Sequence, residues 1–255
     1  MRVERIEIFK LFGGTAILSK QVFTDLFRPP MYLRLVWDQV YRIGVESTPL
    51  VLITAASTGM VMTLQFGVGL EKFGGKPYAP KIIALAIVRE MGPVFTCIML
   101  AARVGAGIAS EIGSMTVTQQ IDAIRALGTS PIKKIVVPRV LASLIAIPLL
   151  VVMSDIIGIT GSLIVGVNDL GLDAHFFIQK VLYTVVVEDF IAGWAKTPFF
   201  ALFISITACY FGLNVQGGTQ GVGSSTTKSV VTSCIMIFVG DYFLTKLFWV
   251  IGTWL

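Results

Sequence analysis

Charged residues inside otherwise apolar stretches are the first candidates for chemistry in this chain, foremost Arg89, Glu90 and Lys196. A charged side chain at the centre of a bilayer costs about 2.5–3.5 kcal/mol on insertion scales, so it needs a partner or a function there. For these three residues we favour a polar site or pathway within the membrane. Structural ion pairing between helices is the alternative.

Four further charges lie in apolar stretches, namely Arg103, Glu111, Asp155 and Asp241. For these we favour structural ion pairs between helices, for example Arg103 with Glu111 or with Asp155. A functional site is the alternative for this group, because intramembrane charges often mark substrate pathways.

Signatures of catalysis and of nucleotide binding are missing from the sequence. It contains no Gly-x-Ser-x-Gly elbow and no His-Glu-x-x-His pair. The glycine-rich stretch 217–223 is followed by Ser224 and Ser225, whereas a P-loop needs Lys and then Ser or Thr directly after its last glycine. We therefore expect a flexible linker there, a chain that is not an enzyme, and no ATP site of its own.

Metal binding is also disfavoured by the residue types present. Cys97, Cys209 and Cys234 lie in apolar runs without a Cys-x-x-Cys spacing, and His175 is the single histidine. Small apolar packing is the simplest role for such cysteines. We expect no metal and no cofactor.

The composition describes a membrane protein. Of 255 residues, 55% are hydrophobic and 14% are charged, against about 25% charged in soluble domains. The net charge of +5 indicates membrane orientation rather than nucleic-acid binding, because the basic residues flank apolar stretches. The chain does not open on an uninterrupted apolar region with a small-residue cleavage site, so we expect no cleaved signal sequence.

Long uncharged runs predict the fold class, an all-α integral membrane protein. The first run, 47–70, is long enough as a helix to cross about 30 Å of hydrocarbon at 1.5 Å per residue. We expect a turn at 71–81, a loop or interfacial segment at 169–188 and a hydrophilic connection at 214–228. The five predicted transmembrane helices are 47–70, 82–115, 140–168, 190–213 and 229–255.

Residues 1–45 form a separate N-terminal arm in this prediction. Basic residues alternate there with apolar ones, and Trp37 and Tyr41 are typical of a membrane interface. The arm is interrupted at Arg28-Pro29-Pro30. We expect an interfacial amphipathic helix; a soluble amphipathic arm is the alternative.

A short amphipathic segment lies between the second and third predicted spans. Its apolar stripe is Val117, Ile121, Ile124 and Leu127. Thr116 and Gln119 have capping-box spacing, while Gly128 and Pro131 provide the stop. We expect a cytoplasmic helix that docks its apolar face in a groove of a transport ATPase. A helix that lies on lipid is the alternative.

Basic residues predict the orientation of the chain. With five spans, the side that holds the N-terminus carries twelve basic residues and the other side carries four. The positive-inside rule places the N-terminus in the cytoplasm and the C-terminus on the periplasmic side.

Together these residues resemble the MlaE/YrbE-type permease family, the membrane subunits of lipid-moving ABC transporters. The resemblance covers roughly residues 35 to 250 and implies a single permease domain over 1–255, with the arm at 1–45 and the bundle at 46–255. It is carried by Arg89-Glu90-Met91-Gly92-Pro93, Arg103-Val104-Gly105-Ala106, Glu111-Ile112-Gly113-Ser114-Met115 and Gln120-Ile121-Asp122-Ala123, with Pro138-Arg139, Asp155, Lys196, Gly212, 221–223 and Thr226-Thr227 in support.

The resemblance implies a permease that moves phospholipid between the inner membrane of a diderm bacterium and a periplasmic MCE-domain ring, supporting outer-membrane lipid asymmetry. The implied partners are a second permease copy in a homodimer, a cytoplasmic ABC ATPase that binds the ATP, and in some systems a STAS-domain subunit. No nucleic-acid partner is implied. An ABC permease for another hydrophobic substrate, such as a sterol, and an ATPase-independent secondary transporter or channel are the alternatives.

The resemblance also implies site residues. Cationic groups would suit a phosphate head and apolar ones the acyl chains. The family usually has Glu at the position of Gln119, so any contact that this carboxylate makes with the ATPase in the family would lack its charge here. The implied lipid-binding residues are Leu64, Gln65, Val68, Arg89, Glu90 and Lys196, and the implied ATPase-coupling residues are Val117, Gln120, Ile121, Asp122 and Ile124.

Overall fold

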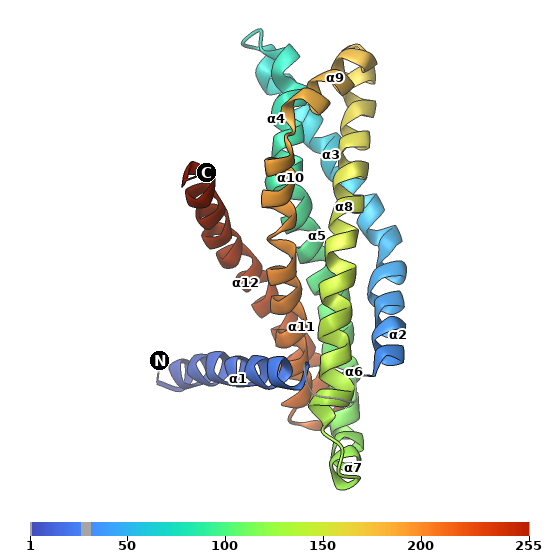
Figure 1. The fold of residues 1–255 in the computed structure, drawn as a ribbon, viewed down its shortest axis with the longest axis vertical. Coiled ribbons are helices and arrows are strands. Elements are labelled where there is room, and N and C mark those ends of the chain that lie inside the picture. The colour runs from blue at the N-terminus through green and yellow to red at the C-terminus, as the bar shows by residue number, and fades with distance from the viewer. Residues whose placement is uncertain (1, 27–31, 255) are drawn as a thin grey trace. The chain divides into compact units, whose positions relative to one another are not determined.

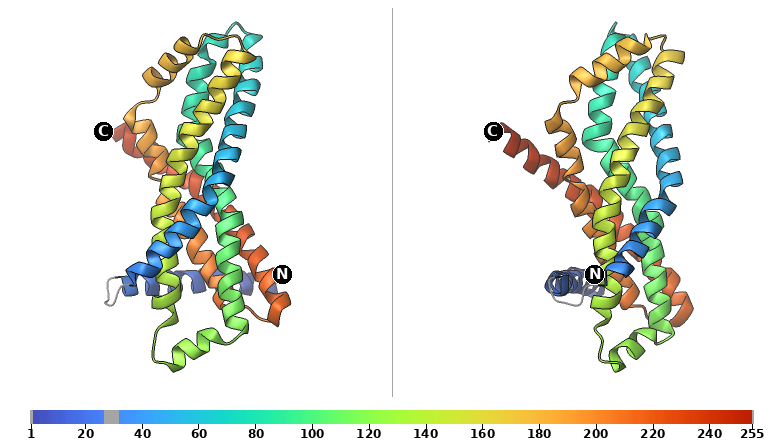
Figure 2. Two further views of the ribbon diagram at one scale, coloured as in Figure 1. Left: turned by 90° about the vertical axis from the view of Figure 1, so that its right-hand side faces the viewer. Right: turned by 45° about the vertical axis from the view of Figure 1, so that its right-hand side comes forward.

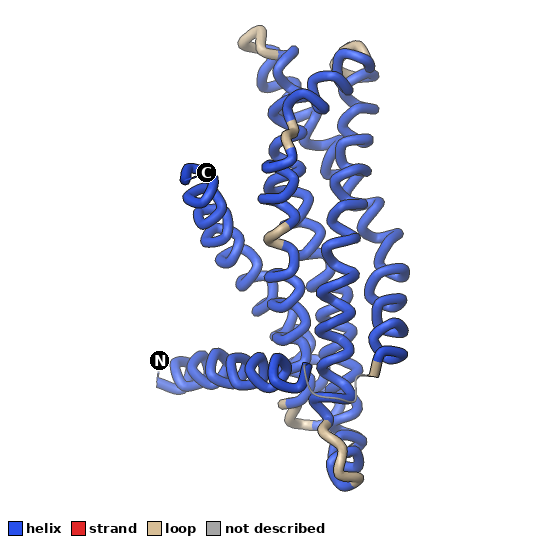
Figure 3. Tube along the Cα trace, in the orientation of Figure 1, coloured by secondary structure: helices blue, strands red, loops and turns tan. Residues whose placement is uncertain are grey.

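Helices make up nearly all of the described chain. The structure, a computed structural model, describes residues 2–26 and 32–254, with side chains described over 13–26 and 32–250, and it contains no strand in these ranges (Figure 3). This confirms the all-α fold class predicted from the long apolar runs.

The helices follow one another with short connections (Figure 1). The α-helices are α1 Arg2–Leu26, α2 Leu33–Gly44, α3 Thr48–Glu71, α4 Ala79–Ala86, α5 Gly92–Leu100, α6 Ala106–Val117, α7 Gln120–Ala126, α8 Val137–Asn168, α9 Ala174–Thr184, α10 Val187–Trp194, α11 Thr197–Leu213 and α12 Gly218–Trp254. Short tight or wide turns join several of them: the 3₁₀ segments η1 Val45–Ser47 and η2 Lys76–Tyr78, and the π-helical segments η3 Ile87–Met91, η4 Ala101–Gly105 and η5 Ile132–Val136.

Five helical runs in the described chain are long and apolar enough to cross a membrane, as predicted. The protein is therefore a multi-pass membrane protein. The runs are Leu33–Glu71, Lys76–Val117, Ile132–Asn168, Val187–Leu213 and Gly218–Val250.

At the predicted boundary between arm and bundle the chain forms a 3₁₀ turn, because α2 continues through η1 into α3. The remaining arm forms α1, and the predicted break at Arg28-Pro29-Pro30 lies outside the described residues. The location of the arm in the membrane interface stays a prediction.

The glycine-rich connection is shorter than predicted, and the expectation of a flexible linker over 217–223 is wrong. Positive φ angles at Gly217 (88°) and Gly218 (67°) complete a turn, which glycine adopts without a Cβ clash. α12 begins at Gly218, so most of 214–228 is helical. Val222 then packs against Gly113 of α6, where a Cβ would lie 3.3 Å from the valine Cγ1. This packing stabilises the first turns of α12 despite their glycine content.

Contacts divide the chain into two compact units, each built from three stretches. The first contains the chain up to Val45 together with Leu100–Ala146 and Phe200–Ile237, and the second contains Glu46–Met99, Ile147–Phe199 and the chain from Phe238 on. In the first unit, α7 is a short helix in the connection between α6 and η5 (Figure 2).

Small residues allow close helix packing in the second unit. A Cβ at Gly59 of α3 would lie 1.9 Å from the carbonyl oxygen of Gly158 of α8, an approach that only glycine permits. Ile83 and Ile87 are buried beside α3 and form an apolar core with Phe66. α3, the η3 region and α8 are thereby held together around the residues described next.

Candidate functional site

The π-helical segment η3 carries Arg89 and Glu90 in the second unit. A π-helix widens the helical turn and often occurs at functional sites. α10 approaches η3 closely because Gly193 has no side chain: a Cβ there would lie 2.0 Å from the carbonyl oxygen of Val88. The wide turn and the glycine together bring the start of the fourth span against Arg89 and Glu90.

Lys196 occupies the break between α10 and α11 and is 2% exposed. Its Nζ donates to Glu90 Oε2 at 2.7 Å and to the carbonyl oxygen of Arg89 at 3.2 Å. From α12, Asp241 Oδ1 lies 3.0 Å and Thr245 Oγ1 lies 2.6 Å from the same nitrogen. Thus one buried ammonium connects three helical segments.

Arg89 forms the second ion pair of this site. Its Nε donates to Asp189 Oδ1 at 2.6 Å, and its Nη2 also contacts that oxygen. Asp189 is almost fully buried and its other oxygen accepts the N–H of Val186 at 3.2 Å, at the start of α10. The Arg89 side chain nevertheless remains half exposed, with 54% of it accessible.

A cavity of about 380 Å³ opens beside these pairs. Its size lies within the range of about 300–1,000 Å³ that is typical of small-molecule sites. Charged groups and aromatic rings share its wall. The lining residues are Arg89, Glu90, Glu188, Ala192, Lys196, Thr245, Phe248 and Trp249.

The structure brings together three of the six predicted lipid-binding residues, Arg89, Glu90 and Lys196. The other three, Leu64, Gln65 and Val68, lie on the exposed face of α3 and do not line this cavity. All six keep their roles as predictions. The expected ion pair of Asp241 is present, with Lys196 as its partner.

Sequence reasoning missed most of the remaining cavity wall. Asp189, which pairs with the wall residue Arg89, was not singled out either. The available signal was its position three residues after Val186 at the start of an apolar run, where a carboxylate can accept the free N–H groups of a helix. Thr245, Phe248 and Trp249 carried no signal, because they lie among many similar residues of the last span.

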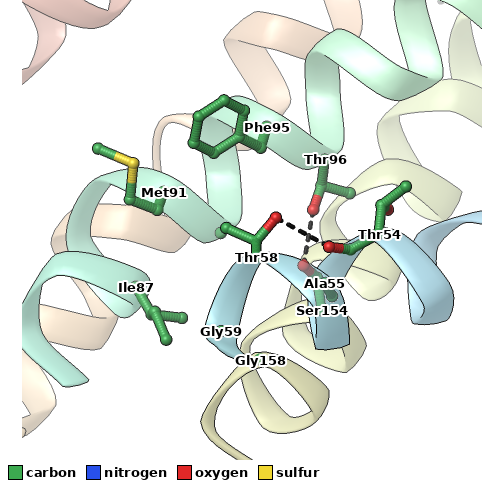
Figure 4. Close-up of a pocket in the computed structure, with 11 residues that line it drawn as sticks. Thr54, Ala55, Thr58, Gly59, Ile87, Met91, Phe95, Thr96, Ser154 and Gly158 are labelled. Atoms are coloured by element: carbon green, nitrogen blue, oxygen red, sulfur yellow. Dashed lines mark hydrogen bonds between the residues drawn. The ribbon is translucent and has the colours of Figure 1, made fainter. Parts of the chain in front are cut away.

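Ser154 lines a smaller pocket of the second unit (Figure 4), and Asp155 is the next residue of α8. Its side chain is 5% exposed, and its Oδ1 is buried without a hydrogen-bond partner among the described residues. Gly92 lies so close that a Cβ there would be 1.8 Å from this oxygen. Thr96 donates to Ser154 Oγ at 2.7 Å across the pocket wall.

Glu111 pairs with two arginines in the first unit. Its Oε2 accepts from Arg139 at 2.8 Å and its Oε1 from Arg42 at 3.3 Å. We expected an ion pair here, with Arg103 as a possible partner; the pair exists with these two arginines. Arg139 also donates to the carbonyl oxygen of Ile135, within η5.

The short helix between the second and third spans is α7, which ends at Ala126, and the predicted stop residue Gly128 follows with a φ of 74°. The predicted capping box is wrong. Thr116 lies in the last turn of α6, and its hydroxyl donates to the carbonyl oxygens of Ile112 and Gly212 at 2.9 and 3.0 Å. Gln119 adopts a left-handed conformation with φ 59° and makes no side-chain cap.

The residues of the predicted apolar stripe differ in their exposure to solvent. Ile121 is 3% exposed within its own chain, so its side chain packs inside this chain, and its role in docking stays a prediction. Leu127 is 81% exposed, whereas Val117 and Ile124 are half-buried. Gln120 and Asp122 are exposed, and Asp122 pairs with Arg125 at 3.1 Å. Coupling to an ATPase stays a prediction for this segment.

A chain with five apolar helices and a charged cavity has the architecture of a multi-pass membrane transport protein. Comparison with known proteins specifies the family. The family model described as Permease MlaE matches residues 36–247. The chain therefore belongs to the MlaE permease family, and it is a permease of the ABC-transporter type.

Individual relatives agree with this assignment. A probable ABC transporter permease protein of Rickettsia felis is 38% identical over 243 residues, which cover 95% of this chain and 94% of the relative. Another from Synechocystis sp. is 36% identical and covers 94% and 91%. Protein TRIGALACTOSYLDIACYLGLYCEROL 1, chloroplastic, of Arabidopsis thaliana is 32% identical and covers 91% of this chain and 66% of the relative.

Proposed function

We propose that this permease moves phospholipids between the bacterial inner membrane and a periplasmic MCE-domain carrier, and so supports outer-membrane lipid asymmetry. The observation that carries the proposal is the cavity of the second unit, where a half-exposed Arg89 lies near Phe248 and Trp249. A phospholipid presents the complementary groups, a phosphate for the arginine and apolar chains for the aromatic rings. The Arabidopsis relative, whose name contains that of a diacylglycerol lipid, supports a lipid substrate.

The proposed assembly contains two copies of this chain, a cytoplasmic ABC ATPase that binds ATP, a periplasmic MCE ring and, in some systems, a STAS-domain subunit. Leu64, Gln65 and Val68 are exposed on α3, and we assign them to the acyl-chain route. The basic-residue asymmetry supports a cytoplasmic N-terminus and a periplasmic C-terminus.

Reconstitution with the ATPase tests the proposal. Proteoliposomes that contain fluorescent phospholipid are given ATP, and transfer to a soluble MCE domain is measured. We expect ATP-dependent transfer that falls at least tenfold in Arg89→Gln, while the exposed control Lys72→Gln transfers like the wild type. Transfer of sterol but not phospholipid would favour the other hydrophobic-substrate class. Ion flux without the ATPase would favour a secondary transporter or channel.

A further inference from the structure

The charges around the cavity are unbalanced. Two side chains are cationic, whereas twice as many are carboxylates, so an anionic ligand meets an excess of like charge. The cations are Arg89 and Lys196, and the carboxylates that line the cavity or pair with these cations are Glu90, Glu188, Asp189 and Asp241.

Lys196 has no donor left for a ligand. An ammonium group has three N–H donors, and four oxygen atoms already lie within 2.6–3.2 Å of its Nζ. It is also 2% exposed. A lipid phosphate that enters the cavity therefore meets Arg89 as its cationic partner, and Lys196 acts as a positioning residue for Glu90.

Groups that can bind a cation remain accessible in the wall of the cavity. Glu188 is exposed at the cavity and forms no ion pair with the described side chains. Glu90 keeps one third of its side chain exposed. Phe248 and Trp249 line the same cavity, and aromatic faces attract ammonium groups, tryptophan most strongly.

We propose that this cavity selects phospholipids whose headgroup carries an ammonium group over anionic phospholipids with the same acyl chains. The phosphate binds Arg89, and the ammonium group binds Glu188 beside the two aromatic rings. This inference rests on the proposed function. It adds a headgroup class, zwitterionic and amine-bearing, that the charge distribution favours.

Lipid competition tests the headgroup class. The permease is purified with its ATPase from vesicles of equal phosphatidylethanolamine and phosphatidylglycerol with matched chains, and bound lipids are quantified by mass spectrometry. We expect phosphatidylethanolamine to be enriched on the order of fivefold, the effect of one cation–π or ion-pair contact. The enrichment falls to about onefold in Glu188→Gln and stays at the wild-type level in Asp169→Asn, which removes an exposed carboxylate outside the cavity.

The outcomes separate this inference from the function on which it rests. Bound phospholipid without enrichment, or enrichment of phosphatidylglycerol, overturns the headgroup assignment and leaves phospholipid transport standing. Enrichment that persists in Glu188→Gln overturns the role of that carboxylate. Complete absence of phospholipid from the purified complex, with no transfer in the reconstituted assay, overturns both.

Discussion

Lys196 and Glu90 are 106 positions apart in the sequence, yet the ammonium nitrogen of one lies 2.7 Å from a carboxylate oxygen of the other. Asp241 shares the same ammonium group from α12 at 3.0 Å. One cation thus balances part of the charge of two carboxylates in the second unit. This arrangement makes the cation a structural requirement of the cavity.

Removal of Lys196 should destabilise the protein strongly. Lys196→Met leaves Glu90 and Asp241 without their shared cation, and breaking a buried pair in this way costs about 3–5 kcal/mol. We expect a clear loss of thermal stability in detergent, measured by intrinsic fluorescence. Lys72→Met, at an exposed lysine, serves as the control. Equal melting temperatures for the two variants would contradict the structural role.

Enlargement of Gly193 should separate α10 from η3. Alanine places a Cβ 2.0 Å from the Val88 carbonyl oxygen, and overpacking of this kind costs about 1–3 kcal/mol. Gly107→Ala is the matched control, since no heavy atom lies within 4 Å of its Cβ and alanine favours a helix by up to about 1 kcal/mol. We expect Gly193→Ala to lower the melting temperature and Gly107→Ala to raise it. A higher melting temperature for Gly193→Ala would refute the close contact.

The exposed end of α7 is where ATPase docking should be tested. Leu127→Asp changes an 81% exposed side chain, so we expect the permease to fold and the copurified ATPase to decrease at least tenfold. Ile121→Asp instead buries a carboxylate and should lower the yield of folded permease itself. Asp122→Ala loses an exposed pair with Arg125 and should have a small effect. Wild-type recovery of the ATPase with Leu127→Asp would show that this end does not dock.

Cysteine labelling tests the orientation of the chain in cells. A cysteine at Gly75 should react with a membrane-impermeant maleimide added from the periplasm, and a cysteine at Thr219 should be protected until the membrane is permeabilised. The basic residues that flank the spans give this expectation. The reverse labelling pattern would place the N-terminus outside the cytoplasm.

The helical fold was largely predictable because transmembrane helices need long apolar runs, and these can be counted. The interruption of the fourth span at Lys196 was not predicted. Pro198 marked it, since proline is favoured in the first turn of a helix and here lies at the start of α11. The π-helical segments had no comparable signal, because they depend on packing between distant segments.

The charged residues of the site were predictable as residues but not as pairs. An apolar run makes Arg89 conspicuous, yet its partner Asp189 is 100 positions away. Nothing in the local spacing links the two. Only the folded chain shows that the cations are already matched by carboxylates, which changes the expectation for the ligand.

The two arginines on Glu111 have a structural consequence for the first unit. Glu111 on α6 and Arg139 on α8 lie on either side of the connection that contains α7, so their 2.8 Å contact joins the two ends of that connection. Arg42 attaches α2 to the same carboxylate. Three helices of the first unit, α2, α6 and α8, therefore meet at one carboxylate beside the connection that contains α7.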